Sequence, residues 1–183
     1  MENTNKQWLI KDALAWTIQY FKSKNLENYR LDAEVILSHI ISKDRLYLYV
    51  HYDQPLTSGE LEQYRAAIIA RIKRMPVAYI TGKKEFMGLE FSVTDDVLIP
   101  RPDTEVVVEA AIEHLNAVHN PFILDLGTGS GAIIISLLSK LPTATGVATD
   151  ISLKALEVAK YNAQHLLKDR QYNFYHSDLF ENI

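Results

Sequence analysis

Apolar positions over the first 75 residues recur every three or four residues, the spacing that places them on one face of a helix. Two such stretches precede Asp44, which can cap a short third one. Thr57 and Glu60 form a capping-box pattern at the start of a fourth stretch, which Pro76 is expected to end. Short connections between such helices favour a compact bundle, so residues 1–75 are predicted to form a helical domain.

The period of the pattern then changes from about 3.6 to 2. In the segment GLEFSVT, which begins at Gly88, apolar and polar residues alternate as in a half-buried strand. The segment AYITGKKEFM comes just before it, and the break at Met87-Gly88 makes it the expected partner in a hairpin. Residues 76–97 are therefore predicted to form a β-hairpin connector.

Helix and strand patterns alternate from residue 98 onward. Pro102 suits the first turn of a helix. After it come FILDL, AIIISLLSKL, TGVATD, SLKALEVAKYNAQHLL and YNFYHSD, which read as strand, helix, strand, helix and strand. This order implies parallel strands joined by right-handed crossovers. The predicted fold class is α/β: a helical bundle, a hairpin connector, and a partial Rossmann-like domain over residues 98–183.

Composition narrows the chemistry that this chain can perform. Without cysteine there is no disulfide framework, thiolate metal site or cysteine nucleophile, and the six histidines show no metal-ligand spacing. The N-terminal segment has no signal-peptide pattern, and no stretch approaches the roughly 18 apolar residues of a membrane span. We therefore expect a cytoplasmic protein that needs neither a metal nor a membrane.

The net charge of −4 is unevenly distributed. Residues 1–75 hold 11 basic and 9 acidic residues, whereas residues 76–183 hold 8 and 14. A basic cluster lies near the end of the predicted bundle, at Arg71, Lys73, Arg74, Lys83 and Lys84. A solvated helix end explains it, and contact with RNA or an acidic partner is the alternative. No charged run is long enough to predict a nucleic-acid-binding protein.

The segment ILDLGTGSGA at 123–132 is the motif that carries chemistry, because it ends a strand and begins a helix. Glycines there let the chain turn tightly and let a ligand approach the backbone, and the helix N-terminus offers unpaired N–H donors. Asp150 ends the next strand, 19 residues after Gly131, where a carboxylate can accept both hydroxyls of a ribose. A nucleotide-type cofactor is predicted, and a tight turn without a ligand is the alternative.

The same letters also satisfy the dinucleotide fingerprint G-x-G-x-x-A, through Gly127, Gly129 and Ala132. Three features argue against NAD: an acidic residue, Asp125, precedes the first glycine by two, glycines occupy every second position, and Asp178 ends a third strand. An acid at that place could meet an adenine amino group. The set as a whole resembles the S-adenosylmethionine-dependent methyltransferases.

Three upstream segments sharpen the resemblance: RLDAEVILSHI at 30–40, PVAYITGKKEFMGLEFSV at 76–93 and VLIPRPDTEVVVEAAI at 97–112. They resemble the HemK/PrmC family, the protein-(glutamine-N5) methyltransferases that modify the Gly-Gly-Gln motif of peptide chain release factors. The similarity covers nearly the whole chain. It implies S-adenosylmethionine as cofactor, a release factor as protein substrate rather than nucleic acid, and a helical N-terminal domain that recognises that substrate.

The resemblance also implies roles for individual residues. Asp150 is expected to bind the cofactor ribose, and Asp178 and Leu179 to lie near the adenine. The remaining expected cofactor contacts are the loop residues Gly127, Thr128, Gly129, Ser130 and Gly131.

The family's substrate motif, Asn-Pro-Pro-Tyr after a fourth strand, does not occur in these 183 residues. We therefore predict no catalytic residue here, read the chain as a C-terminally truncated family member, and expect it to be inactive by itself. The strand at FILDL is expected to be an unpaired sheet edge. For the intact protein two alternatives stay open: methylation of a ribosomal-protein glutamine or a nucleic-acid amino group, and a non-catalytic module that binds a partner.

Overall fold

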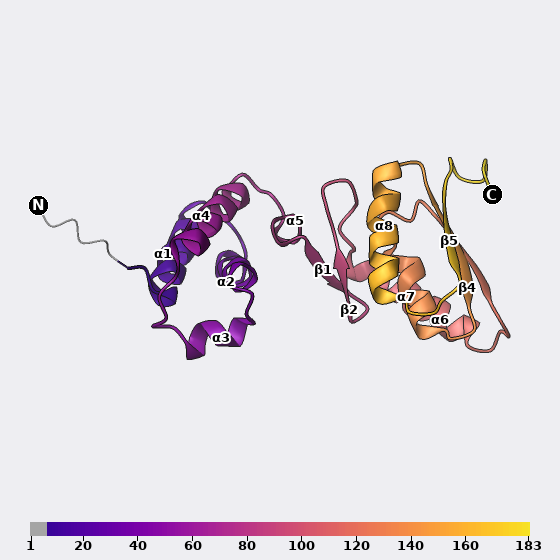
Figure 1. The fold of residues 1–183 in the computed structure, drawn as a ribbon, viewed down its shortest axis with the longest axis horizontal. Coiled ribbons are helices and arrows are strands. Elements are labelled where there is room, and N and C mark those ends of the chain that lie inside the picture. The colour runs from indigo at the N-terminus through magenta and orange to yellow at the C-terminus, as the bar shows by residue number, and fades with distance from the viewer. Residues whose placement is uncertain (1–6) are drawn as a thin grey trace, which may run out of the picture. The chain divides into compact units, whose positions relative to one another are not determined.

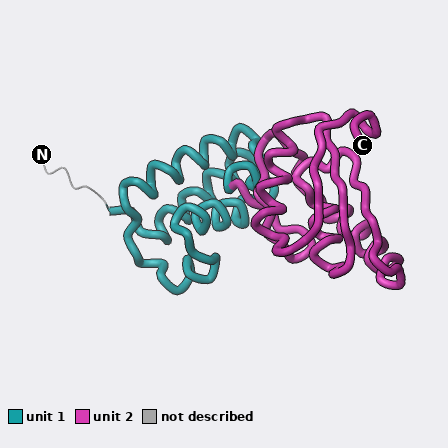
Figure 2. Tube along the Cα trace, turned by 45° about the vertical axis from the view of Figure 1, so that its right-hand side comes forward, with its two compact units in different colours: residues 1–81 teal, residues 82–183 magenta. Residues whose placement is uncertain are grey.

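The computed structural model describes residues 7–183. The chain divides into two compact units, the first ending at Thr81 and the second spanning Gly82–Ile183 (Figure 2). Each unit has its own hydrophobic core. The division by role stays a prediction: a recognition domain over 1–75, a connector over 76–97 and a cofactor-binding half over 98–183.

Unit 1 is a helical bundle, as the apolar periodicity predicts. The side chain of Asp44 accepts a hydrogen bond from the Tyr47 N–H at 2.8 Å, and Thr57 and Glu60 form the expected capping box. The helices of this unit are α1 (Ile10–Ser23), α2 (Tyr29–Ile40), α3 (Arg45–Val50), α4 (Ser58–Ile72) and α5 (Val77–Thr81).

Two local predictions near Pro76 are wrong. Helix α4 ends at Ile72 rather than at the proline, and Arg74 takes a positive φ of 69° beyond it. The segment after Pro76, predicted to be extended, instead forms α5, because the proline carbonyl accepts the N–H groups of Tyr79 and Ile80. A proline at a helix start has a suitable fixed φ, and it favours this turn.

Apolar side chains from four helices fill the core of unit 1, with Phe21, Ile36 and Leu37 fully buried. Two arginines of the basic cluster form polar contacts at its margin. The buried Asp32 carboxylate accepts a hydrogen bond from Arg71 Nε at 2.8 Å, so this member of the basic cluster has a structural role. The neighbouring Arg74 donates to backbone carbonyls at the end of the first helix.

The predicted hairpin is confirmed and begins unit 2. Strand β1 (Lys83–Phe86) pairs antiparallel with β2 (Leu89–Ser92). Met87 and Gly88 form the turn with φ of 53° and 75°, the backbone that a two-residue turn with two positive φ angles requires. Phe86 and Phe91 meet edge to face at 6.1 Å and are buried in the core of unit 2, so the hairpin packs within this unit.

The predicted parallel α/β arrangement is also confirmed. Strands β3 (Phe122–Leu126), β4 (Thr145–Asp150) and β5 (Tyr172–His176) form a parallel sheet in that order. Among the described residues β3 pairs on one side only, as expected for an edge. The helices of unit 2 are α6 (Pro102–Leu115), α7 (Ala132–Lys140) and α8 (Leu153–Leu166) (Figure 1).

Helices α7 and α8, which connect β3 to β4 and β4 to β5, pack against these strands and against each other, so they cover the same face of the sheet. Side chains on that face, such as Ala148, are buried, and α7 contributes five buried side chains to the core. On the opposite face Phe122, Leu124 and Tyr175 are exposed. Within residues 7–183, no helix combines the length and the apolar character that crossing a bilayer requires.

Candidate functional site

The carboxyl ends of the three parallel strands meet at one edge of the sheet. Leu126 lies opposite Thr149, and Asp150 lies opposite His176. The glycine-rich loop, the turn at Asp150 and the turn after β5 therefore leave the sheet side by side. Ligands of open parallel sheets bind at this edge.

The three glycines of the loop adopt backbone conformations that other residues rarely take. Gly127, Gly129 and Gly131 have φ of 71°, 57° and 81°. A Cβ built on Gly127 or Gly129 meets no atom within 4 Å, whereas one on Gly131 lies 2.6 Å from Ile135 Cδ1. The first two glycines thus present bare backbone to open space, and the third lets α7 begin close to its neighbours.

Hydrogen bonds fix the loop in this shape. The Thr128 hydroxyl donates to Asp125 Oδ2 at 2.7 Å, and its N–H donates to the Thr149 carbonyl at 2.9 Å. Burial raises the pKa of the Asp125 carboxyl, and the nearby Asp150 carboxylate raises it further. The hydrogen bonds from Thr128 and from the Ile134 backbone lower this pKa, but the net pKa is raised. Asp125, which the sequence marks only by its distance from the first glycine, is therefore the anchor of the loop.

Asp150 lies directly against the loop. Its Oδ2 accepts the N–H of Gly129 at 2.9 Å, and its Oδ1 accepts the N–H of Ser152 at 2.9 Å. A carboxylate oxygen has two lone pairs, so each oxygen keeps one for a further donor. The carboxylate is thus placed to accept two hydroxyls of a ligand that lies in front of Gly127 and Gly129, and the site fits a nucleoside.

Asp178 and Leu179 occupy the turn after β5 and are exposed. The Ser177 N–H donates to the Asp150 carbonyl at 3.1 Å, which brings this turn to the same sheet edge. Among the described residues no hydrogen bond joins the Asp178 side chain to the glycine-rich loop. The contact of Asp178 and Leu179 with an adenine stays a prediction.

Sequence reasoning missed one residue that shapes the site. Asn162 of α8 is 1% exposed, and its side-chain amide contacts two separate segments. Its Oδ1 accepts the N–H of Ser92 at 2.8 Å, and its Nδ2 donates to the carbonyls of Ser92 and Ser130 at 2.9 Å each. The available signal is a polar residue on the buried face of a helix otherwise lined by small side chains such as Ala159 and Ala163.

Glu105 is a second residue with a role that sequence reasoning missed. Its acidic side chain in the first turn of α6 suits the helix dipole, as expected. In the structure its carboxylate also accepts the Met87 N–H at 2.7 Å, which ties the hairpin turn to this helix. The hairpin is thus held both by α6 and by α8.

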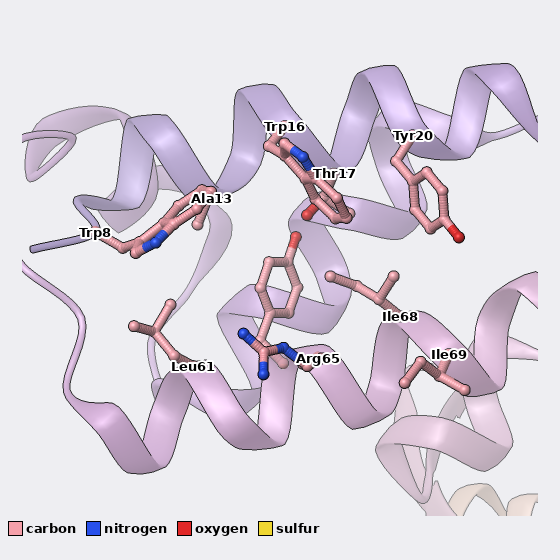
Figure 3. Close-up of a pocket in the computed structure, with 10 residues that line it drawn as sticks. Trp8, Ala13, Trp16, Thr17, Tyr20, Leu61, Arg65, Ile68 and Ile69 are labelled. Carbon is pink, nitrogen blue, oxygen red and sulfur yellow. The ribbon is translucent and has the colours of Figure 1, made fainter. Parts of the chain in front are cut away.

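Unit 1 contains a groove between α1 and α4, with a volume of about 370 Å³ (Figure 3). Trp16 is 51% exposed at this groove and stacks on Tyr20 with ring centroids 4.9 Å apart. Ile68 and Ile69 line the opposite side. Arg65 projects from α4 toward the same groove, and no other described residue forms a hydrogen bond or ion pair with its side chain.

Both units match known protein families. Residues 12–82 match the PrmC N-terminal domain, and residues 105–183 match the methyltransferase small domain. The release factor glutamine methyltransferase of Chlorobaculum tepidum is 45% identical over 86% of this chain and 55% of its own length. The corresponding protein of Geobacter sulfurreducens gives the same values over a slightly shorter alignment.

A bifunctional methyltransferase of Rickettsia conorii is 36% identical over 97% of this chain and 38% of its own length. The chain therefore spans about half the length of the first two relatives and less of the third. The two family matches occur in the same order as the helical bundle and the parallel sheet, and together they cover most of the residues. Over both of its units, the chain is therefore similar to the HemK/PrmC family of release factor glutamine methyltransferases.

Proposed function

We propose that the protein containing these residues transfers a methyl group from S-adenosylmethionine to a glutamine side chain of peptide chain release factors, within their Gly-Gly-Gln motif. One observation carries the proposal: a glycine-rich loop opens beside the Asp150 carboxylate at the sheet edge where nucleosides bind. The names of its relatives, release factor glutamine methyltransferases, supply the reaction and the substrate.

The cofactor would lie against the exposed backbone of Gly127 and Gly129. The two free lone pairs of Asp150 would accept its ribose hydroxyls, and Asp178 and Leu179 would border its adenine. When bound, S-adenosylmethionine supplies a methyl group made electrophilic by a positive sulfur. The task of Asp125 and Thr128 is to keep the loop in the shape that this binding requires.

A glutamine amide nitrogen is a weak nucleophile because its lone pair is delocalised into the carbonyl. Catalysis must therefore come mainly from orientation and from polar groups that hold the amide. The family's Asn-Pro-Pro-Tyr motif, to which that task belongs, does not occur in residues 1–183. We expect these residues alone to methylate no release factor.

Unit 1 is proposed to recognise the release factor, with the groove between α1 and α4 as the contact surface. The half-exposed Trp16 and Ile69 provide apolar area, and Arg65 adds a charge that no described residue neutralises. Aromatic and arginine side chains of this kind dominate binding energy in protein interfaces. Because release factors act at the ribosome, we propose the cytoplasm as the compartment.

The test uses the gene product that contains residues 1–183, a purified release factor and S-adenosylmethionine, with mass spectrometry of the glutamine-containing peptide. We expect one methyl group on that glutamine. Asp150→Ala should weaken cofactor affinity about tenfold or more, because hydrogen bonds to a charged group are lost. Glu113→Gln, which changes an exposed acid of α6, should leave it unchanged. An unmodified glutamine under saturating cofactor would refute the proposed reaction.

The recognition surface is tested separately. Trp16→Ala should raise the KM for the release factor and leave cofactor affinity unchanged. Tyr52→Ala removes an aromatic side chain of similar exposure that does not line the groove, and it is the matched control. Equal effects of the two changes on KM would place the contact elsewhere.

A further inference from the structure

Unit 1 holds a buried carboxylate far in sequence from the motifs discussed so far. The side chain of Glu34, on α2, is only 2% exposed. Arg30 Nε donates to its Oε1 at 3.0 Å, and Arg45 Nη2 and Nε donate to its Oε2 at 2.6 Å and 3.2 Å. The Tyr49 hydroxyl also donates to Oε1. Two guanidinium groups and a phenol thus surround one carboxylate.

The cluster carries an excess positive charge. Burial by itself raises the pKa of Glu34, but the hydrogen bonds from Tyr49, Arg45 and Arg30 outweigh that effect and the net pKa is lowered. The carboxylate is therefore ionised at neutral pH and neutralises one of the two arginines. Among the described residues neither arginine forms an ion pair with any other acid.

Much of the hydrogen-bonding capacity of both arginines is unused. Each guanidinium has five N–H donors. Arg30 uses Nε toward Glu34 and one donor of Nη2 toward the Tyr49 hydroxyl at 3.4 Å, and Arg45 uses Nε and Nη2. Their side chains are 66% and 51% exposed and line a cavity of about 360 Å³.

The buried carboxylate also fixes where these donors point. The contacts with Glu34 hold one edge of each planar guanidinium. The opposite edge therefore loses little further side-chain entropy when it binds a second oxyanion. The rim of the cavity carries Leu31 and Tyr49, both about half exposed, which can cover an aliphatic stem. Glu27, an exposed acid, also lines this cavity and opposes an anionic ligand there.

From this arrangement we propose that Arg30 and Arg45 form a docking site for a carboxylate side chain on an acidic peptide segment of a partner protein. The excess charge attracts the carboxylate, the free N–H donors bind it in the bidentate geometry that suits guanidinium groups, and the rim contacts its stem. This site is built by α2 and α3, whereas the groove in Figure 3 lies between α1 and α4. It goes beyond methyl transfer, because its test involves neither the cofactor nor a glutamine.

The experiment titrates the chain of residues 1–183 with an acetylated, amidated Glu-Glu-Glu peptide at low salt and follows the arginine Nε–Hε signals by NMR. We expect saturable shifts at Arg30 and Arg45, none with the matched Gln-Gln-Gln peptide, and weaker binding as salt is added. Arg30→Ala should weaken binding about tenfold or more, since charge-assisted hydrogen bonds are lost. Glu27→Gln should strengthen it severalfold by removing a like charge.

The matched control is Lys22→Ala, which removes an exposed basic residue of the same unit that lines neither the cavity nor the groove and should leave affinity unchanged. Arg30→Ala should fold, because Glu34 keeps Arg45 and Tyr49; a circular dichroism melt verifies this. If it does not fold, Arg30→Lys retains the charge without the fork and should also weaken binding. Equal binding of the glutamine peptide, an equal loss in Lys22→Ala, or displacement of the peptide by a lower concentration of inorganic phosphate would each overturn the proposal.

Discussion

Gly131 ends the glycine-rich loop and is the N-cap of α7, with a left-handed backbone at φ of 81°. Replacement by alanine would place a Cβ 2.6 Å from Ile135 Cδ1 and 3.4 Å from the Ala159 Cβ. Ile135 is fully buried, so its side chain has little room to move away. Gly129→Ala is the matched change: its φ of 57° is also left-handed, but its Cβ meets no atom within 4 Å.

The two substitutions share one penalty and differ in the other. A left-handed backbone at a residue with a Cβ raises the free energy of the folded state by about 1–2 kcal/mol. Forcing extra volume into a packed core adds about 1–3 kcal/mol. Gly131→Ala should therefore lower the free energy of unfolding of unit 2 by about 2–5 kcal/mol, and Gly129→Ala by about 1–2 kcal/mol.

The two units can be followed separately. Both tryptophans, Trp8 and Trp16, belong to unit 1, so their fluorescence reports whether that unit is folded. Amide hydrogen exchange in α7 reports unit 2. A loss of 2 kcal/mol accelerates exchange through global opening roughly 30-fold. We expect that acceleration in Gly131→Ala, and a clearly smaller one in Gly129→Ala.

Equal acceleration in the two variants would refute the packing argument, because it would mean that the close contact with Ile135 adds nothing to the strain of the backbone. No acceleration in either variant would refute both parts of the reasoning.

Three further predictions concern polar side chains. Asn162→Ala leaves the Ser92 N–H and the Ser130 carbonyl without their side-chain partner, so urea denaturation should show that unit 2 is less stable by about 2–4 kcal/mol. Asn173→Ala, which changes an exposed position, is the control and should have little effect. The pKa of Glu34 is lowered in the folded state, so the ionised carboxylate stabilises the fold above the ordinary pKa of 4.5. This stabilisation is lost as the pH falls through the folded-state pKa, and thermal melts of Glu34→Gln should show no such loss of stability at acid pH. The pKa of Asp125 is raised instead, so ionisation opposes folding once pH rises above 3.8, and Asp125→Asn should lack that decline; a steeper decline in the variant would contradict it.

Local chemistry predicts the parts of this fold that depend on neighbouring residues. Asp44 and Thr57 cap the helices that follow them, because the required donor lies only three residues away. The turn at Gly88 and the glycine-rich loop follow from glycines, which tolerate positive φ, whereas the positive φ of Met87 has no such local signal. The order of strands and helices follows from a change of period in the apolar pattern.

Contacts between residues far apart in sequence could not be predicted in this way. Glu34 meets Arg45 and Tyr49 across 11 and 15 residues, and no local pattern pairs them. Asn162 contacts Ser92 across 70 residues, so its role depends on how the hairpin packs on α8. The extent of α4 and the presence of α5 were missed because the residues around Pro76 suit both extended and helical backbone.

The amide of Asn162 has a consequence for building chimeric enzymes from relatives of this family. It acts as an acceptor and as a donor toward the same residue of the hairpin, and as a donor toward the loop, so neither aspartate nor leucine of similar size reproduces its contacts. An exchange of segments that cuts between residues 93 and 162 separates these partners and risks a mismatched loop. A junction at Thr81 and Gly82 keeps them together and lets the helices of unit 1 be exchanged as one piece.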